Sequence, residues 1–545
     1  MVQPAQQNIA QMAAEASVRF AGQPACTCLG RSLSFSQLAS LSDHFAHWLQ
    51  QEAGIKPGDR VALMLPNLLQ YPVTALGVLK AQAVVVNINP LYTPQELQRV
   101  LQDSGAVVLV VVANVAHTVA ALSGATSVRK TVVTEIGDLL GKLAGPLANF
   151  TVRHVSKMIK PFRLANTVGF ATAMRVGKQW CQRQPGLGKD FSADTLAVLQ
   201  YTGGTTGVVK GAMLTHSNLL SNVGQIIASM AGDCPGAAAV MVAPLPLYHI
   251  YAFNLSFLLA LQRGHHVLLI PNPRDSSSVA KAMAGARVQG FIGINTLYQS
   301  LLQNPRFRKL DFSNLRIASS GGMALSMDVS ARWLQLTGKP ILEGYGLTEC
   351  SPLVTCNTYA NYKPNTAGKV TVGTELRLVT ASGKLAAPME AGEIQVRGPQ
   401  VMRGYWNNAD ETAMVLDREG WLRTGDIGVL DADGFLQIVD RIKDLIVVSG
   451  FNVYPKEIEE RVLSHPDIAD ACAVASGDEL APRIKLFVVS SNPSLTTADV
   501  LLHCRTGLAA YKVPKEIEFR TTLPKSALGK VLRRELRDLA RQSAQ

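Results

Sequence analysis

A segment rich in glycine and threonine is the clearest candidate for chemistry in this chain. Residues 201–211 read Tyr-Thr-Gly-Gly-Thr-Thr-Gly-Val-Val-Lys-Gly and follow residues 195–200, an apolar stretch that predicts a buried strand. Glycine lets backbone N–H groups approach phosphate oxygens, threonine hydroxyls add donors, and Lys210 adds positive charge. A Walker A loop is excluded, because the lysine of that loop stands directly before Ser or Thr, whereas Lys210 stands before Gly211. The segment predicts a polyphosphate site, which we expect between the strand and a helix capped by Thr215 or Ser217.

Four further stretches place polar side chains among glycine and hydrophobic residues. They are LPLYHIYAF at 245–253, EGYGLTECSP at 343–352, the long stretch 420–459 that begins GWLRTGDIG, and PKSALGK at 524–530. With the glycine-rich segment, and in this order, they resemble the motifs of the adenylate-forming superfamily of acyl-CoA synthetases and ligases. The resemblance covers about residues 199–532, and it is strongest to the bacterial long-chain fatty acid–CoA ligases of β-oxidation.

The resemblance implies a two-step reaction. A fatty acid is first adenylated by ATP with loss of pyrophosphate, and CoA then displaces AMP to form a thioester. The first step develops negative charge around the α-phosphorus, so cations and hydrogen-bond donors must be in place beforehand. Mg²⁺ is the implied cofactor, with ATP and CoA as co-substrates. Glu349 is the implied metal ligand, because Mg²⁺ prefers oxygen donors, and Thr348 beside it is expected to donate to the α-phosphate.

The nucleotide contacts are carried over from the family motifs one by one. In that pattern Asp426 accepts hydrogen bonds from both ribose hydroxyls, Arg441 reaches the same ribose, and the Tyr345 ring is available to stack on adenine. The expected ATP and AMP contacts are Tyr201, Thr202, Gly203, Gly204, Thr205, Thr206, Gly207, Lys210, Gly322, Glu343, Gly344, Tyr345, Gly346, Asp426 and Arg441.

Lys530 is the expected catalytic lysine, because the last lysine of the PKSALGK motif bridges the carboxylate and the α-phosphate in the family. His249 is expected near the carboxylate, and Phe253 and Gly321 in the acyl pocket. Phe253 stands where some long-chain members carry tryptophan, so it lacks the indole N–H of a polar gate. Lys443 matches the family hinge. With Ser449 and Gly450 it forms the expected hinge and CoA-binding set, in which Gly450 would let the pantetheine arm approach the backbone.

Simpler interpretations exist for several of these residues when they are taken alone. Asp426 follows a glycine, as a turn residue often does. His249 lies in an apolar stretch, where a hydrogen-bonded core histidine is common, and Lys530 lies in a basic tail, where lysine is usually solvated. Lys525 in the same motif matches no family role.

The alternation of apolar runs and helical patterns predicts an α/β protein. Strands are expected at 60–65, 83–89, 107–112, 130–134, 240–243, 267–270, 290–294 and 315–319, and helices at 36–51, 70–81 and 93–103. Short alternating segments after residue 370 predict a small β-rich subdomain. The resemblance places a boundary at residue 440, giving an adenylate-forming N-terminal domain (1–440) and a mobile C-terminal α+β domain (441–545). A homodimer is a further expectation.

The net charge of +12 is concentrated in one acid-free stretch. Between Asp138 and Asp190 nine lysines and arginines alternate with hydrophobic residues such as Phe150, Phe162 and Phe170. This composition is typical of a segment that lies on an anionic membrane. A pair of surface helices packed on their own domain explains it equally well, and a nucleic acid partner is not expected.

No apolar run is long enough to span a bilayer, and the N-terminus lacks a secretory pattern. With eight scattered cysteines, we expect a cytoplasmic protein held peripherally at the inner face of the membrane.

Three rival functions remain open at this stage. An acyl-AMP ligase would pass its acyl group to a carrier protein, and a related enzyme would adenylate an aryl or medium-chain acid. A nonenzymatic binder of fatty acids would not need the full set Lys530, Glu349 and Asp426. A structural membrane protein is the least favoured interpretation.

Overall fold

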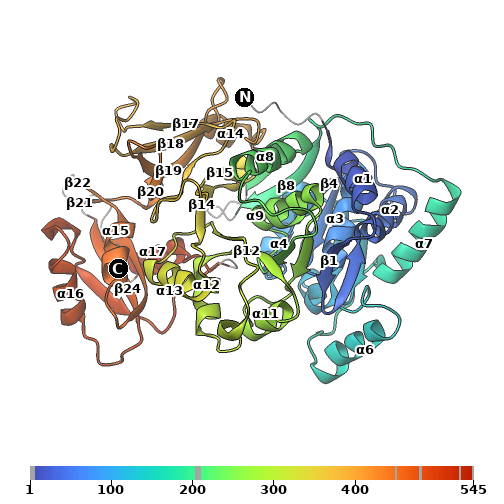
Figure 1. Cartoon of the computed structure of the whole chain (residues 1–545), viewed down its shortest axis with the longest axis horizontal. Helices are drawn as coiled ribbons and strands as arrows, with labels where there is room; N and C mark the ends of the chain where they lie inside the picture. The colour runs from blue at the N-terminus through green and yellow to red at the C-terminus, as the bar shows by residue number, and fades with distance from the viewer. Residues whose placement is uncertain (1–6, 203–209, 449–450, 478–481, 527–528, 543–545) are drawn as a thin grey trace. The chain divides into compact units, whose positions relative to one another are not determined.

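The computed structural model describes residues 7–202, 210–448, 451–477, 482–526 and 529–542 (Figure 1). Contacts divide the chain into two compact units. Unit one comprises Met1–Glu375 and Arg397–Leu422, and unit two comprises Leu376–Val396 and Arg423–Gln545. These units are defined by packing, whereas the expected boundary at residue 440 concerns movement and stays a prediction.

The first sheet of unit one is almost entirely parallel. Its order is β7-β6-β5-β3-β4-β8-β9, and only the β8–β9 pair is antiparallel. The central strands are apolar along their whole length because helices cover parallel sheets on both faces. The strands are β3 (Arg60–Met64), β4 (Val84–Asn87), β5 (Val108–Val112), β6 (Lys130–Thr134), β7 (Thr167–Gly169), β8 (Leu196–Thr202) and β9 (Lys210–Thr215).

The second sheet of unit one has nine strands in the order β16-β15-β14-β13-β12-β10-β11-β1-β2. It is parallel from β14 to β1 and antiparallel at both edges. The strands are β1 (Pro24–Cys28), β2 (Arg31–Ser34), β10 (Val240–Ala243), β11 (His266–Leu269), β12 (Val288–Gly293), β13 (Ile317–Ser320), β14 (Leu342–Gly346), β15 (Leu353–Cys356) and β16 (Lys369–Val370).

Helices pack against these sheets and between them, and most begin at a capping side chain. Thr93 caps α4 and Thr215 caps α8, each by accepting a backbone N–H three residues on. The longer helices of unit one are α1 (Ile9–Arg19), α2 (Phe35–Gln51), α3 (Gln70–Lys80), α4 (Pro94–Ser104), α7 (Phe170–Arg183), α8 (His216–Ser229), α11 (Ser276–Met283), α12 (Asn295–Gln303) and α13 (Met327–Thr337), with the shorter α14 at Ala409–Val415.

Unit two contains smaller sheets with their own apolar core. A four-stranded sheet joins β17 (Glu375–Val379), β18 (Gly392–Arg397), β19 (Leu422–Leu430) and β20 (Leu436–Arg441). The C-terminal part pairs β21 (Ile446–Val448) with β22 (Phe451–Val453), and β23 (Ile468–Ser476) with β24 (Arg483–Ser490) and β25 (Glu516–Phe519). Its helices are α15 (Pro455–Leu463), α16 (Thr497–Arg505) and α17 (Arg533–Gln542).

The predicted α/β class is confirmed, as are the predicted strands and helices to within a few residues. The predicted helix cap at Thr215 is confirmed, because Thr215 caps α8. One element was not predicted: residues 210–215 form a second strand, β9, antiparallel to β8.

The acid-free stretch divides into a packed part and an exposed part. Helix α7 packs on α2, and a Cβ atom at Gly177 would lie 1.9 Å from the carbonyl oxygen of His44. Phe170 is 1% exposed, and Phe162 packs against the core of the first sheet. The expectation that Phe162 and Phe170 could insert into a membrane is therefore wrong.

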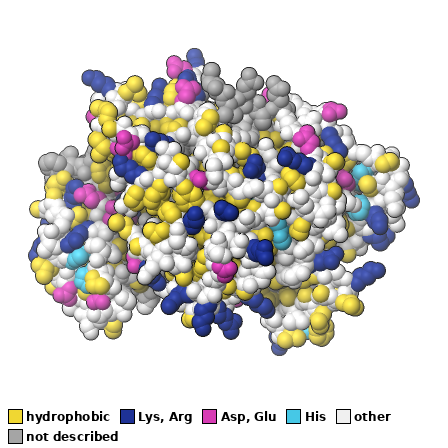
Figure 2. All heavy atoms as spheres, viewed as in Figure 1, with side chains coloured by type: hydrophobic (Ala, Val, Ile, Leu, Met, Phe, Trp, Pro, Cys, Tyr) yellow, Lys and Arg dark blue, Asp and Glu magenta, His cyan; other side chains and the backbone are white. Residues whose placement is uncertain are grey.

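The exposed part is α6 (Ala144–Phe150) with the π-helical turn η2 (Thr151–Val155). Leu143 is 88% exposed, Leu147 67% and Phe150 57%, and Val155 and Met158 are also exposed. Figure 2 shows hydrophobic side chains together with basic ones at the lower right, where Figure 1 places α6. Among the described residues no helix is both long and apolar enough to cross a bilayer.

Candidate active site

The β8–β9 hairpin presents Lys210 at the base of the glycine-rich loop, where it faces Thr202. Its ammonium lies 2.5 Å from a carboxylate oxygen of Glu411 and 5.3 Å from the centre of the Tyr405 ring. Residues 203–209 lie outside the described residues, so the expected contacts at Gly203, Gly204, Thr205, Thr206 and Gly207 stay predictions. The Tyr201 side chain points into the core of the first sheet and donates to Asp103 at 2.5 Å.

Strand β14 delivers the second group of expected residues. Gly344 and Gly346 pack against β15, and a Cβ atom at Gly346 would lie 2.0 Å from the carbonyl oxygen of Pro352. The strand then leads into a single 3₁₀ turn, η5 (Thr348–Cys350). Bare glycine in the strand therefore allows the close packing that sets the position of Thr348 and Glu349.

Tyr405 joins these two groups of residues. Its hydroxyl donates to Oε1 of Glu349 at 2.8 Å, while the Lys210 ammonium lies over its ring. Burial and the Glu349 carboxylate raise the pKa of Tyr405, so it remains a neutral donor. The backbone N–H of Met402 donates to the carbonyl oxygen of Glu349 at 2.8 Å. Lys210 and Glu349, far apart in the sequence, are thus brought to one place by a tyrosine that lies in none of the five motifs.

The expected acyl-side residues also converge in unit one. Nδ1 of His249 accepts the backbone N–H of Tyr251 at 3.3 Å, and burial lowers the pKa of His249 to about 4. At neutral pH the ring is therefore uncharged, with its proton on Nε2 as a free donor. A Cβ atom at Gly321 would lie 3.2 Å from the Tyr251 ring, so a side chain there would require the ring to shift by a few tenths of an ångström. Phe253 is fully buried.

The turn after β13 lies beside the start of β14. Ser320 pairs with Glu343 in the parallel register, and Oε2 of Glu343 accepts the N–H of Leu325 at 3.3 Å. Gly322 has a φ of +79°, a conformation that favours glycine. Gly321 and Gly322 therefore lie directly after the carboxyl end of β13, the usual position of ligand sites in parallel sheets, beside Glu343 at the start of β14.

Unit two brings together four other expected residues. Asp426 and Arg441 face each other across β19 and β20, with Nε of Arg441 3.0 Å from Oδ1 of Asp426. Desolvation by surrounding protein atoms, together with the positive charges of Arg441 and Lys443, lowers the pKa of Lys530 to about 8, while Asp426 opposes the shift and the residue keeps an exposed surface. Asp426, Arg441, Lys443 and Lys530 therefore form one electrostatic cluster.

The motif's other lysine has a different environment. Lys525 is 2.5 Å from a carboxylate oxygen of Asp470, so its charge is already paired. Ser449 and Gly450 lie outside the described residues, and their expected roles in CoA binding stay predictions.

Two structural carboxylates near the expected hinge lay outside the sequence predictions. Oδ2 of Asp440 accepts the backbone N–H of Lys456 at 2.9 Å, in the first turn of α15. Asp444 binds Arg537 of α17 at 2.7 Å. The basic composition of the C-terminal helix was a signal for the contact of Asp444 with Arg537. The contact of Asp440 with Lys456 depends on tertiary structure that no local sequence pattern reveals.

Glu349 fits the expected role in Mg²⁺ binding. Tyr405 donates to one of its two carboxylate oxygens, Oε1, and Mg²⁺ is commonly held by one or two carboxylates plus phosphates and water. No group of three or more His, Cys, Asp or Glu side chains among the described residues could hold a metal by itself.

Comparisons with known proteins identify the family. The family model described as "AMP-binding enzyme" matches residues 13–406. The model described as "AMP-binding enzyme C-terminal domain" matches residues 457–530. The chain belongs to the AMP-binding enzyme family.

Several relatives are similar along nearly their whole length. The long-chain-fatty-acid–CoA ligase of Salmonella typhimurium is 46% identical over 538 residues, covering 98% of this chain and 95% of that protein. A feruloyl-CoA synthase of an Amycolatopsis species is 35% identical, covering 93% and 94%. The structure of ATP-bound MatB from Rhodopseudomonas palustris superposes with a TM-score of 0.81 at 26% identity, covering 99% of this chain and all of that one.

Proposed function

We propose that this chain is an AMP-forming long-chain fatty acid–CoA ligase. The observation that carries the proposal is the 46% identity maintained over 538 residues with the Salmonella ligase.

In the adenylation step, a carboxylate oxygen of the fatty acid attacks the α-phosphorus of ATP. The bond between the α-phosphorus and the bridging oxygen breaks, and pyrophosphate leaves with the electron pair. Both reactants are anionic, so the step depends on positive charge and hydrogen-bond donors placed in advance. We assign Lys530 and Lys210 to the phosphates, Asp426 to the ribose and Nε2–H of His249 to the carboxylate. Mg²⁺, held through Glu349, would neutralise phosphate charge when bound.

In the second step, the CoA thiolate attacks the acyl carbon, and the bond to AMP breaks. Here AMP leaves with the electron pair of its bond to the acyl carbon, and no bond to phosphorus forms or breaks, so the step does not require the ammonium that we assign to the phosphates. We assign Lys443 to the hinge between the two steps. Its position in the 3₁₀ turn η6 (Ile442–Asp444), directly after β20, agrees with that role.

The proposal is tested by measuring pyrophosphate release over a panel of carboxylic acids, with and without CoA. Long-chain fatty acids should give the highest kcat/KM, and acyl-CoA should form only when CoA is present. Release without any thioester would favour an acyl-AMP ligase, and a preference for aryl acids would favour a different ligase.

Lys530→Ala should abolish adenylation but preserve thioester formation. The expected loss in the first step is at least roughly 10²–10³-fold, because a preorganised charge is removed. The measurement compares pyrophosphate release with the conversion of preformed acyl adenylate and CoA. Lys525→Ala is the matched control, since that lysine belongs to the same motif and is paired with Asp470. Equal loss of both half-reactions in Lys530→Ala would contradict the assignment.

Lys443→Pro should leave adenylation near normal and suppress thioester formation. Proline fixes φ and restricts the preceding residue, which opposes a change of backbone conformation at the hinge. Pyrophosphate exchange and acyl-CoA output are measured separately. Lys443→Ala removes the same charge without the backbone restriction, so it should retain both half-reactions. If the alanine variant loses thioester formation equally, the residue acts through its charge and is no hinge.

We also propose peripheral contact with anionic membrane, confined to α6 and the residues around it. The five exposed hydrophobic side chains of residues 143–158 supply insertable surface, and Lys157, Lys160 and Arg163 supply positive charge beside it. Arg153 contributes less, because it pairs with Glu135 at 2.5 Å. A cytoplasmic location at the inner face of the membrane is part of the same proposal, and self-association as a homodimer stays a prediction.

Leu147→Glu with Phe150→Glu should release the protein from anionic vesicles. Both side chains are exposed, so the change should not disturb folding. Cosedimentation at low salt measures binding. Reversal of Lys157, Lys160 and Arg163 to Glu should weaken it by roughly 10²-fold or more, since each basic residue contributes about 1 kcal/mol near such a surface. Leu385→Glu with Leu502→Glu is the control at equally exposed sites outside the stretch. A wild-type protein that ignores anionic vesicles would overturn this proposal.

A further inference from the structure

Residues 244–248 follow strand β10 and form a connecting segment whose backbone is held by side chains from the half of unit one that contains the first sheet. Asn67 makes three of these contacts. Its Nδ2 donates to the carbonyl oxygens of Ala243 at 3.0 Å and Leu245 at 2.8 Å, and its Oδ1 accepts the N–H of Leu247 at 2.8 Å. Asn67 is buried, so water does not compete for these hydrogen bonds.

A chain of buried polar side chains reaches the connecting segment from helix α3 and strands β4 and β8. The Tyr71 hydroxyl lies 2.6 Å from Oδ1 of Asn87 and 2.8 Å from the carbonyl oxygen of Leu247. Nδ2 of Asn87 donates to Oε1 of Gln200 at 3.0 Å, and Nε2 of Gln200 donates to the carbonyl oxygen of Tyr248 at 3.1 Å. Burial raises the pKa of Tyr71, so its hydroxyl keeps the proton that it donates. The three side chains are at most 4% exposed, which makes the loss of any of these hydrogen bonds costly.

Gln200 stands between the two elements that are expected to hold the reacting groups. It lies on β8 two residues before Thr202, where the strand leads into the glycine-rich loop. Its partner Tyr248 directly precedes His249, and the N–H of His249 donates to the carbonyl oxygen of Pro246 at 2.9 Å. One side chain therefore connects the strand before the expected phosphate site to the turn that carries the expected carboxylate group.

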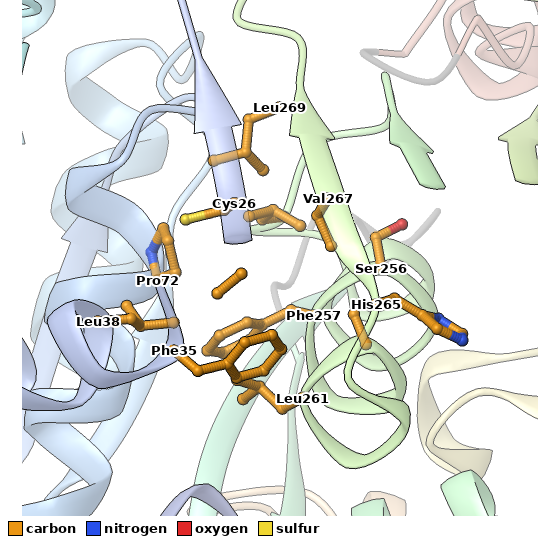
Figure 3. Close-up of a pocket in the computed structure, with 13 residues that line it drawn as sticks. Cys26, Phe35, Leu38, Pro72, Ser256, Phe257, Leu261, His265, Val267 and Leu269 are labelled. Carbon is orange, nitrogen blue, oxygen red and sulfur yellow. The ribbon is translucent and has the colours of Figure 1, made fainter. Parts of the chain in front are cut away.

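Apolar packing also restrains the connecting segment. Leu247 lines a small cavity together with Pro72 of α3 and Phe257 of the π-helical turn η3 (Phe253–Leu258) (Figure 3). The cavity encloses about 20 Å³, which is room for about one water molecule. Closely packed interiors resist small displacements, so the segment cannot move into this space without displacing its neighbours. Hydrogen bonds and packing together hold the turn before His249 in one position.

We propose that Gln200 is a positioning residue for adenylation, which fixes His249 relative to the glycine-rich loop so that the fatty acid carboxylate meets the α-phosphate. The inference rests on the proposed function, in which Nε2–H of His249 holds the carboxylate. Asn67 and Tyr71 support the same arrangement by holding the segment before His249. A displacement of about 1 Å between reacting groups can lower a rate by about 10²-fold, so a hydrogen bond remote from the reacting atoms can control the rate.

Gln200→Met tests this role, because methionine has a similar length but lacks the amide. It should lower kcat for pyrophosphate release by roughly 10-fold to 10²-fold, while the affinity for ATP alone, measured by calorimetry, changes by less than about twofold. Gln70→Met is the matched control. Gln70 is also a buried glutamine, but its Nε2 donates to the carbonyl oxygen of Glu135 at 2.8 Å, away from the connecting segment. The control should keep a kcat near the wild-type value.

A double-mutant cycle with His249→Ala shows whether Gln200 acts through His249. In the His249→Ala background, Gln200→Met should lower the rate further by less than about twofold, because the group that it positions is gone. An equal additional loss in both backgrounds would overturn the proposal. A loss of ATP affinity as large as the loss of kcat would also overturn it, since Gln200 would then act by stabilising the β8–β9 hairpin.

Tyr71→Phe gives a second test if Gln200→Met fails to fold, as its melting temperature would show. This variant removes one hydroxyl and should give a smaller loss with the same dependence on His249. A wild-type rate in Tyr71→Phe, or a loss that persists in full in the His249→Ala background, would then overturn the proposal. A fully active His249→Ala would refute the role of His249 and this inference with it, whereas a wild-type protein that activates no fatty acid would refute the proposed ligase function itself.

Discussion

Repulsion between two anions is the constraint on which the rest of this structure depends. A carboxylate must approach a triphosphate, and neither reacts unless positive charge and donors are already in place. The two compact units hold different parts of that requirement. Unit one holds Lys210, paired with Glu411 and stacked on Tyr405, and unit two holds Lys530 beside Arg441 and Lys443. A carboxylate lies in each group, Glu411 beside Lys210 and Asp426 beside Arg441, and it reduces the repulsion among the cations.

The second constraint is that the proposed substrate is amphipathic. Its charged end needs the polar groups just described, whereas its tail needs apolar surface and a source in the membrane. His249 lies at the start of an apolar helical run, residues 250–263, in which Phe253 and Phe257 are buried. The exposed hydrophobic residues of α6 lie in the same unit, on a different element.

Regular elements could be predicted from the sequence because their signals are local. Strands such as β6 and β10 match their predicted bounds, since continuous apolar runs mark buried parallel strands. Motif residues such as Asp426 and Arg441 were named correctly as neighbours through the family resemblance, and the β19–β20 register now explains their pairing.

Contacts between distant segments could not be predicted in this way. Tyr405 lies in no motif, yet it joins Lys210 and Glu349 because residues 402–406 run beside β9 and η5. The basic stretch has a similar composition throughout, but its residues lie in two different environments. Phe170 is buried because α7 packs on α2, whereas Phe150 is exposed. Strand β9 was missed because its apolar alternation is short and follows a glycine-rich loop directly.

The central claim is that a protonated Lys530 is needed for adenylation, and the pH dependence of that step tests it most directly. Because the pKa of Lys530 is lowered to about 8, the ammonium is lost as the pH rises through that value. The kcat/KM for pyrophosphate release, which reports groups of the free enzyme, should therefore fall above about pH 8. Lys530→Arg should react more slowly but lose this alkaline limb, since arginine stays charged. An identical limb in Lys530→Arg, or a wild-type profile with no alkaline decline, would contradict the account.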